Sequence, residues 1–138
     1  MTEKDAITNY TTSFNVTFGG TGYSSNYAVI YSGSINGTSY VGISAGDNPN
    51  DNFNSFKLFI YLEDTSITGD DKDLSANNGM IKVIENGVPY ETATPAMTID
   101  ISDMGDGTYT IHSDNGTVSV GGTDITFNSD IRALRAGN

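Results

Sequence analysis

The residue best suited to chemistry is the single histidine, His112, which stands two residues before Asp114. An imidazole oriented by a carboxylate can act as the general base on a serine hydroxyl. No nucleophile-elbow motif accompanies the pair. The alternation of apolar and polar residues puts His112 on the same strand face as Thr108 and Thr110. We therefore interpret His112 as a surface residue that titrates near neutral pH, and we expect no catalytic residues and no enzymatic activity.

Paired carboxylates are the next chemistry to consider, because glycosidases place two acids on either side of a sugar. Acids are plentiful, but nearly all of them fall in predicted loops or on polar strand faces. The chain has no Trp to stack on a sugar ring, although its eight Tyr could do so. Glycoside hydrolysis is therefore disfavoured, and sugar binding is kept as an alternative. The acids considered are Glu63, Asp64, Asp70, Asp71, Asp73, Asp100, Asp103 and Asp106.

Calcium is the best candidate among small ligands, because it prefers several carboxylate, amide and backbone oxygens. Two polar loops could supply such oxygens, and neither has the residue spacing of an EF-hand. The alternative is that both are polar turns carrying solubilising charge. The candidate ligands are Asp47, Asn50 and Asp51 in one loop, and Asp70, Asp71 and Asp73 in the other. No other cofactor is expected.

The composition excludes several classes of function. The 17 acids and six bases give a net charge of −11, so no basic surface is expected to bind nucleic acid or an anionic membrane. With no cysteine, disulfides, thiolate catalysis and Cys-based metal sites are ruled out. The first ten residues lack a basic region followed by an apolar run. The protein is therefore not exported by a cleaved signal, or such a signal precedes residue 1.

Alternating apolar residues and glycine turns predict strands along most of the chain. Residues 1–12 are expected to form an arm, and residues 13–138 a single β-sandwich domain. Asn36-Gly37 predicts a type I′ hairpin, because both residues tolerate positive φ. Asn115-Gly116 and Gly121-Gly122 predict two turns that divide residues 108–128 into three short strands. The other strands are expected at 13–18, 27–35, 39–45, 55–62, 79–85, 88–92 and 97–102, with 130–134 extending or following the last one.

About nine strands in this arrangement indicate an all-β fold, an antiparallel β-sandwich with consecutive hairpins or an up-and-down barrel. We favour the sandwich, because two long polar stretches, 46–54 and 63–78, could carry the chain from one sheet to the other. A short helix is possible around Asp73 to Asn77. Pro89 places the strand at 88–92 on an edge.

The remaining candidates for function are surfaces for subunit contact. The strand Ser55 to Leu62 is apolar on both faces, so we expect a second layer, a loop or a partner subunit to cover it. The arm and the C-terminal segment each carry isolated apolar residues. The partner-contact residues predicted in this way are Ile7, Tyr10, Phe56, Phe59, Tyr61, Ile131 and Leu134. We expect self-association, or contact with other protein subunits, without insertion into a membrane.

Two families share this sequence style. The segments FNVTFGGTGYSS and GTYTIHSDNGTVSVGGTDITFNS resemble β-rich domains of Bacteroidetes surface lipoproteins, although the lipobox cysteine is absent. The small, acidic, cysteine-free, strand-rich chain also resembles bacteriophage virion proteins of the head-decoration, tail-tube or head–tail joining type. The second resemblance implies a non-enzymatic subunit located in the virion. The first implies an extracellular or cell-surface binding module, which we keep as the alternative.

Overall fold

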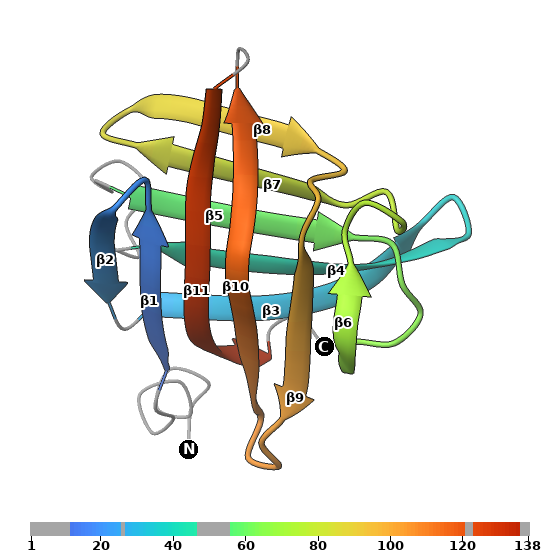
Figure 1. Cartoon of the computed structure of the whole chain (residues 1–138). Coiled ribbons are helices and arrows are strands. Elements are labelled where there is room, and N and C mark those ends of the chain that lie inside the picture. Colours follow the sequence, from blue (N-terminus) through green and yellow to red (C-terminus); the bar gives the residue numbers. More distant parts are fainter. Residues whose placement is uncertain (1–11, 26, 47–55, 121–122, 136–138) are drawn as a thin grey trace.

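Eleven strands make up the computed structural model, which describes residues 12–25, 27–46, 56–120 and 123–135 (Figure 1). No helix occurs within these ranges, so none there is long and apolar enough to cross a membrane. The predicted arm lies outside them except for Thr12. The strands are β1 (Ser13–Phe18), β2 (Thr21–Ser25), β3 (Tyr27–Ile35), β4 (Thr38–Gly46), β5 (Phe56–Leu62), β6 (Gly69–Asp73), β7 (Met80–Glu85), β8 (Val88–Ala93), β9 (Thr98–Asp103), β10 (Thr108–Val120) and β11 (Thr123–Arg135).

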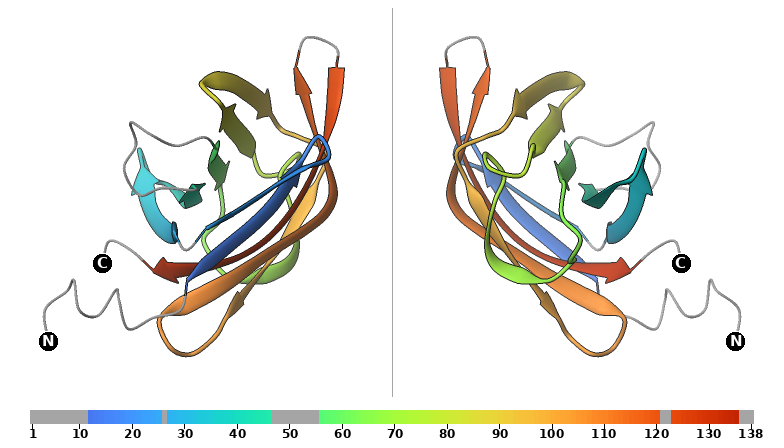
Figure 2. Two further views of the ribbon diagram at one scale, coloured as in Figure 1. Left: turned by 90° about the vertical axis from the view of Figure 1, so that its left-hand side faces the viewer. Right: turned by 90° about the vertical axis from the view of Figure 1, so that its right-hand side faces the viewer.

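The strands form one continuous sheet that folds into two layers. The first layer has the order β6-β9-β10-β11-β1-β2, and the second has the order β3-β4-β5-β7-β8. They join at the end of β11, where Leu134 and Arg135 pair in parallel with Val29 and Ile30 of β3. Figure 1 shows the first layer running across the second, and Figure 2 shows the two layers face to face. The all-β sandwich is therefore confirmed, and the sheet does not close into a barrel.

The core lies between the layers and is built from the inward-facing residues of nearly every strand. In β5 the alternation is complete, because Phe56, Leu58, Ile60 and Leu62 are at most 1% exposed. Burying an aliphatic or aromatic side chain of this size contributes about 1.5–3 kcal/mol. The same alternation buries Val16, Phe18, Ala28, Ile30, Val41, Ile43, Ala45, Ile81, Val83, Ile99, Ile101, Ile111, Val118, Ile131 and Ala133.

The predicted Asn-Gly hairpins are confirmed. Asn36 and Gly37 have φ of 52° and 84°, and the flanking strands pair from Ile35 with Thr38 onward. Asn86 and Gly87 have φ of 50° and 84° between β7 and β8. Positive φ at both central residues gives the type I′ twist that matches the twist of the flanking strands. Strand β8 is the last strand of its layer, as Pro89 predicted.

The turn predicted at Asn115-Gly116 is wrong, because β10 runs through this position as a single strand. The register against β11 shifts between the pairs Ser113–Ser129 and Gly116–Phe127, so β10 contains one extra residue. This is a β-bulge, which restarts the alternation of the strand. Ile111 is buried before the bulge and Val118 after it. The bulge keeps both apolar runs facing the core, so two 13-residue strands replace the three short ones.

The two long polar stretches have different roles. Residues 63–68 carry the chain from β5 in the second layer to β6 in the first, as expected of a stretch that crosses between layers. The stretch 46–54 does not cross, because β4 and β5 are paired neighbours in one layer. The predicted helix is instead a turn over residues 74–78, in which the Asn77 N–H donates to the Asp73 carbonyl at 3.2 Å. Strand β6 was not predicted.

A tyrosine joins the two layers near one end of the core. The Tyr23 hydroxyl on β2 donates to Glu85 Oε2 on β7 at 2.5 Å, and the Tyr23 ring stacks on Phe56 with centroids 4.3 Å apart. We expect Tyr23→Phe, which keeps the ring and removes the hydroxyl, to lower the free energy of unfolding by about 1–2 kcal/mol, because a bond to a charged acceptor is lost. Urea denaturation measures this change. A variant as stable as the wild type would show that the stacked ring alone joins the layers.

Candidate functional site

The candidate calcium ligands do not form a cluster in the part of the chain that the structure describes. Asp47, Asn50 and Asp51 lie outside the described residues. On β6, Asp70 and Asp71 are exposed, and the Asp71 N–H donates to Asp100 Oδ1 at 2.7 Å. Asp73 Oδ1 accepts from the backbone N–H and hydroxyl of Ser75 at 2.9 and 2.6 Å. Among the described residues, no three His, Cys, Asp or Glu side chains are grouped to hold a metal. Calcium binding stays a prediction, tested by whether added calcium raises the melting temperature.

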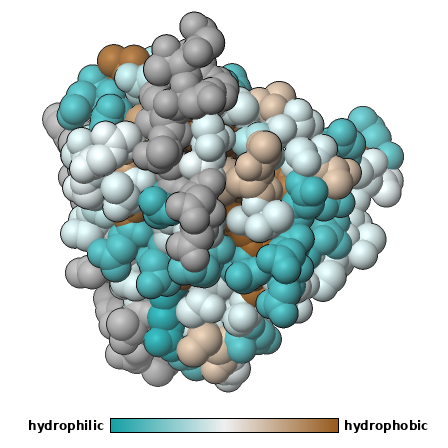
Figure 3. All heavy atoms as spheres, in the orientation of Figure 1, coloured by the Kyte–Doolittle hydropathy of each residue, from teal (hydrophilic) through white to brown (hydrophobic). Residues whose placement is uncertain are grey.

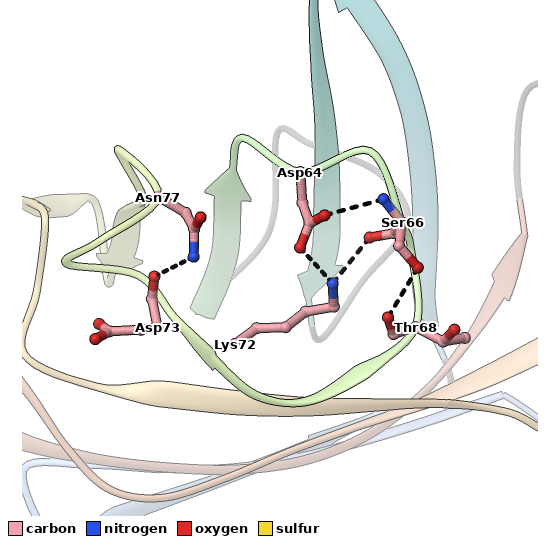
Figure 4. Close-up of polar contacts among 6 residues, drawn as sticks. All are labelled: Asp64, Ser66, Thr68, Lys72, Asp73 and Asn77. Carbon is pink, nitrogen blue, oxygen red and sulfur yellow. Dashed lines mark hydrogen bonds and ion pairs between the residues drawn. The ribbon is translucent and has the colours of Figure 1, made fainter.

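Lys72 shapes the connection between the layers. Its Nζ lies 2.6 Å from Asp64 Oδ2 and donates to the Ser66 carbonyl at 2.9 Å (Figure 4). The lysine side chain is only 6% exposed, whereas that of Asp64 is 27% exposed. The hydrogen bond from Lys72, aided by one from the Ser66 N–H, lowers the pKa of Asp64. The ion pair ties residues 63–68 to β6 and gives this polar segment a fixed shape.

The outer surface of the first layer is polar, and we call it the polar face. Figure 3 views the molecule from this side and shows mostly hydrophilic residues. A hollow of about 390 Å³ opens on it. Backbone register places one row of polar residues across the face, from Asp100 on β9 through His112 and Asp130 to Asn15 and Ser24. His112 is exposed there, as predicted from the alternation.

The hydroxyls closest to His112 in sequence do not serve it. Ser113 and Ser129 are 2% and 4% exposed, and their Oγ atoms lie 2.7 Å apart on the core side of the first layer. Thr108, which the alternation placed beside His112 in solvent, is instead completely buried. It is covered because Arg132 Nε donates to its hydroxyl at 2.9 Å while Arg132 also pairs with Asp106 at 2.5 Å. This contact closes the turn between β9 and β10 and belongs to the scaffold.

The outer surface of the second layer is different, and we call it the aromatic face. Its side chains are half-buried, and no described strand forms a third layer over them (Figure 2). Backbone pairing aligns Tyr31, Gly42, Tyr61 and Met80 in one row across four strands. The face consists of Tyr27, Val29, Tyr31, Tyr40, Lys57, Phe59, Tyr61, Met80, Lys82 and Ile84.

Glycines let the tyrosines of this face lie flat on the sheet. A Cβ at Gly42 would come within 2.3 Å of the Tyr31 ring, and one at Gly33 within 2.9 Å of the Tyr40 hydroxyl. Each glycine is the cross-strand partner of the tyrosine that covers it. The rings also contact one another, with centroids 6.4 Å apart for Tyr31–Tyr40 and 5.5 Å for Tyr40–Tyr61. The result is a packed aromatic surface fixed by the backbone register.

The aromatic face stays uncharged on its tyrosine side. Burial, followed by the neighbouring Tyr40, raises the pKa of Tyr31. Burial and then the carboxylate of Glu63 raise the pKa of Tyr61. Both phenols are therefore neutral at physiological pH and present rings and hydroxyls to whatever contacts the face.

The predicted partner-contact residues separate into three groups. Phe56 and Ile131 are corrections, because they are 0% and 1% exposed and belong to the core. Phe59, Tyr61 and Leu134 are half-buried, and the first two lie on the aromatic face. Ile7 and Tyr10 lie outside the described residues. The sequence analysis missed Tyr31 and Tyr40, although the pairing set by Asn36-Gly37 brings both onto the face that carries Tyr61.

Comparison with known proteins adds no assignment. The chain matches no protein-family model and no curated protein sequence.

Proposed function

We propose that this protein is a non-enzymatic assembly subunit that associates with copies of itself through the aromatic face. The setting that we put forward is a phage-type virion, as a capsid-decoration, tail or head–tail component. One observation carries the proposal: an outer sheet surface is rich in aromatic and aliphatic side chains across β3, β4, β5 and β7.

The contrast between the two outer surfaces supports this proposal. In a sandwich exposed to water on both sides, strands alternate apolar residues inside with polar residues outside. The polar face follows that rule and the aromatic face departs from it. Tyr and Phe are enriched in protein interfaces, where a rigid ring buries a large area at a small cost in side-chain entropy. Two fixed tyrosine pairs and a central Phe59 therefore suit a protein contact.

The test compares self-association of the wild type with that of Phe59→Ser combined with Tyr61→Ser. The wild type is expected to form oligomers as concentration rises in sedimentation-velocity runs, and the double variant to remain monomeric. The matched control is Val88→Ser with Met104→Ser, which also removes two apolar side chains, 50% and 47% exposed, outside the aromatic face. The control should associate like the wild type. A wild type that stays monomeric at millimolar concentration would contradict the proposal.

A second candidate function has its own supporting observation. A hollow of about 310 Å³ beside the β3–β4 hairpin is lined by Tyr40 and Asp64 together with the hydroxyls of Ser34, Ser39 and Thr65. An aromatic ring beside a carboxylate and hydroxyls can hold a small polar ligand such as a sugar. This arrangement suits the extracellular binding module that we keep as the alternative. Saturable binding of a soluble oligosaccharide, abolished by Tyr40→Ala in a monomeric wild type, would favour it.

A further inference from the structure

The basic side chains are distributed unevenly between the two outer faces. Lys72 and Arg132 form ion pairs with Asp64 and Asp106. Arg135 donates to Ser32 Oγ at 2.9 Å. The other two basic residues in the described ranges, Lys57 and Lys82, both lie on the aromatic face. In a chain of net charge −11, the aromatic face thus carries a local positive potential.

The two lysines flank the aromatic centre of that face. Lys57 Nζ lies 5.3 Å from the centroid of the Phe59 ring, a cation–π distance. Lys82 is the direct cross-strand partner of Phe59, from β7. A contact centred on Phe59 therefore includes both positive charges.

The polar face carries the opposite charge. Asp100 and Asp130 lie on it in one register row, on either side of His112. Asp70 and Asp71, both exposed, stand on the adjoining strand β6. The hollow of about 390 Å³ lies at the Asp130 end of that row, so the face is concave where it is acidic. Shape and charge both differ from those of the aromatic face.

We infer that the aromatic face of one copy docks on the polar face of the next, so that the protein assembles head to tail. The inference rests on the proposed function and specifies its partner surface. Two aromatic faces in contact would bring four lysines together, and two polar faces would bring carboxylates together. Head-to-tail docking alone pairs opposite charges, which matters because the whole molecules repel each other. Repetition of this contact builds a ring or a filament.

Charge reversal on each face tests the inference. One variant combines Lys57→Glu with Lys82→Glu, and the other combines Asp100→Lys with Asp130→Lys. Each variant alone is expected to associate about tenfold more weakly than the wild type, because one side of every contact has the wrong sign. An equimolar mixture is expected to regain association to within about threefold of the wild type, since every contact is again complementary. Sedimentation velocity at one fixed ionic strength measures all three samples.

The outcomes separate this inference from the proposed function. Wild-type association that Asp100→Lys with Asp130→Lys leaves unchanged would overturn head-to-tail docking while keeping self-assembly through the aromatic face. A monomeric wild type would overturn both. Because Asp100 also accepts a hydrogen bond from the Asp71 N–H, Asp130→Lys alone serves as a second variant if the pair lowers the melting temperature. It should weaken association in the same direction, and the Lys57→Glu, Lys82→Glu variant should again restore it.

Discussion

Replacing Gly79 by alanine is expected to destabilise the protein by about 3 kcal/mol, the upper end of ordinary overpacking. A Cβ at Gly79 would lie 2.7 Å from both Cβ and the carbonyl oxygen of Leu74, and 2.8 Å from its Cα. Two of these atoms belong to the backbone, so no change of rotamer removes the clash. The chain cannot move away at low cost either. The Gly79 N–H donates to the Leu74 carbonyl at 2.8 Å, and its own carbonyl accepts from Thr94 at 2.7 Å.

The control for this variant is Gly22→Ala. A Cβ at Gly22 would meet no atom within 4 Å, and the residue is exposed on strand β2. Alanine there is expected to leave the free energy of unfolding unchanged or to raise it by about 0.5 kcal/mol, because alanine loses less conformational entropy on folding. Urea denaturation of both variants measures the difference. Equal stabilities would mean that the turn at 74–78 relaxes freely and does not fix the return of the chain to β7.

The parts of the fold that the sequence predicts well are those governed by local chemistry. Asn36-Gly37 and Asn86-Gly87 tolerate positive φ, so each specifies a hairpin and its register without help from the rest of the chain. The alternation in β5 likewise shows which side chains enter the core. A signal that depends on one or two residues and their neighbours survives folding when nothing distant competes with it.

Asn115-Gly116 shows a local signal overridden by distant pairing. The dipeptide has the same turn chemistry as the confirmed hairpins. Here, however, β11 offers an unbroken partner on both sides, with Ile111 opposite Ile131 and Val118 opposite Ile125. A turn would have forfeited that ladder, whereas a bulge keeps it at the cost of one unpaired residue. The choice depends on residues about ten to twenty positions away.

Strand β6 and the aromatic face were missed for related reasons. Residues Gly69–Asp73 contain no apolar alternation, and the only inward side chain among them is Lys72, which is tolerated because of Asp64. The aromatic face needs the register of four strands before Tyr31, Tyr40 and Tyr61 can be seen to adjoin. The sequence pointed to Phe59 and Tyr61 by their position on a doubly apolar strand. It could not supply the neighbours that turn two residues into a surface.

The Asp64–Lys72 pair gives the second large effect, and the two sides of the pair should not be equivalent. Asp64→Asn is expected to lower the free energy of unfolding by about 3 kcal/mol, because it leaves the ammonium of Lys72 buried without a counter-charge. Lys72→Met removes that buried charge and keeps most of the side-chain volume. The remaining carboxylate is 27% exposed and can be hydrated, so a loss of about 1 kcal/mol is expected. Equal losses would show that the lysine is hydrated in solution.

The pH dependence of the same pair provides an independent check. The folded pKa of Asp64 is lowered, first by its hydrogen bond from Lys72, so the folded state binds a proton less readily than the unfolded chain. The stabilisation is therefore complete above the unfolded pKa of about 3.9 and is lost as the pH falls through the lower folded value. The wild type and Asp64→Asn should differ most at neutral pH and converge in acid. Because Lys72 keeps its charge throughout this range, a gap that stays constant down to about pH 2 would mean that Asp64 does not ionise in contact with Lys72.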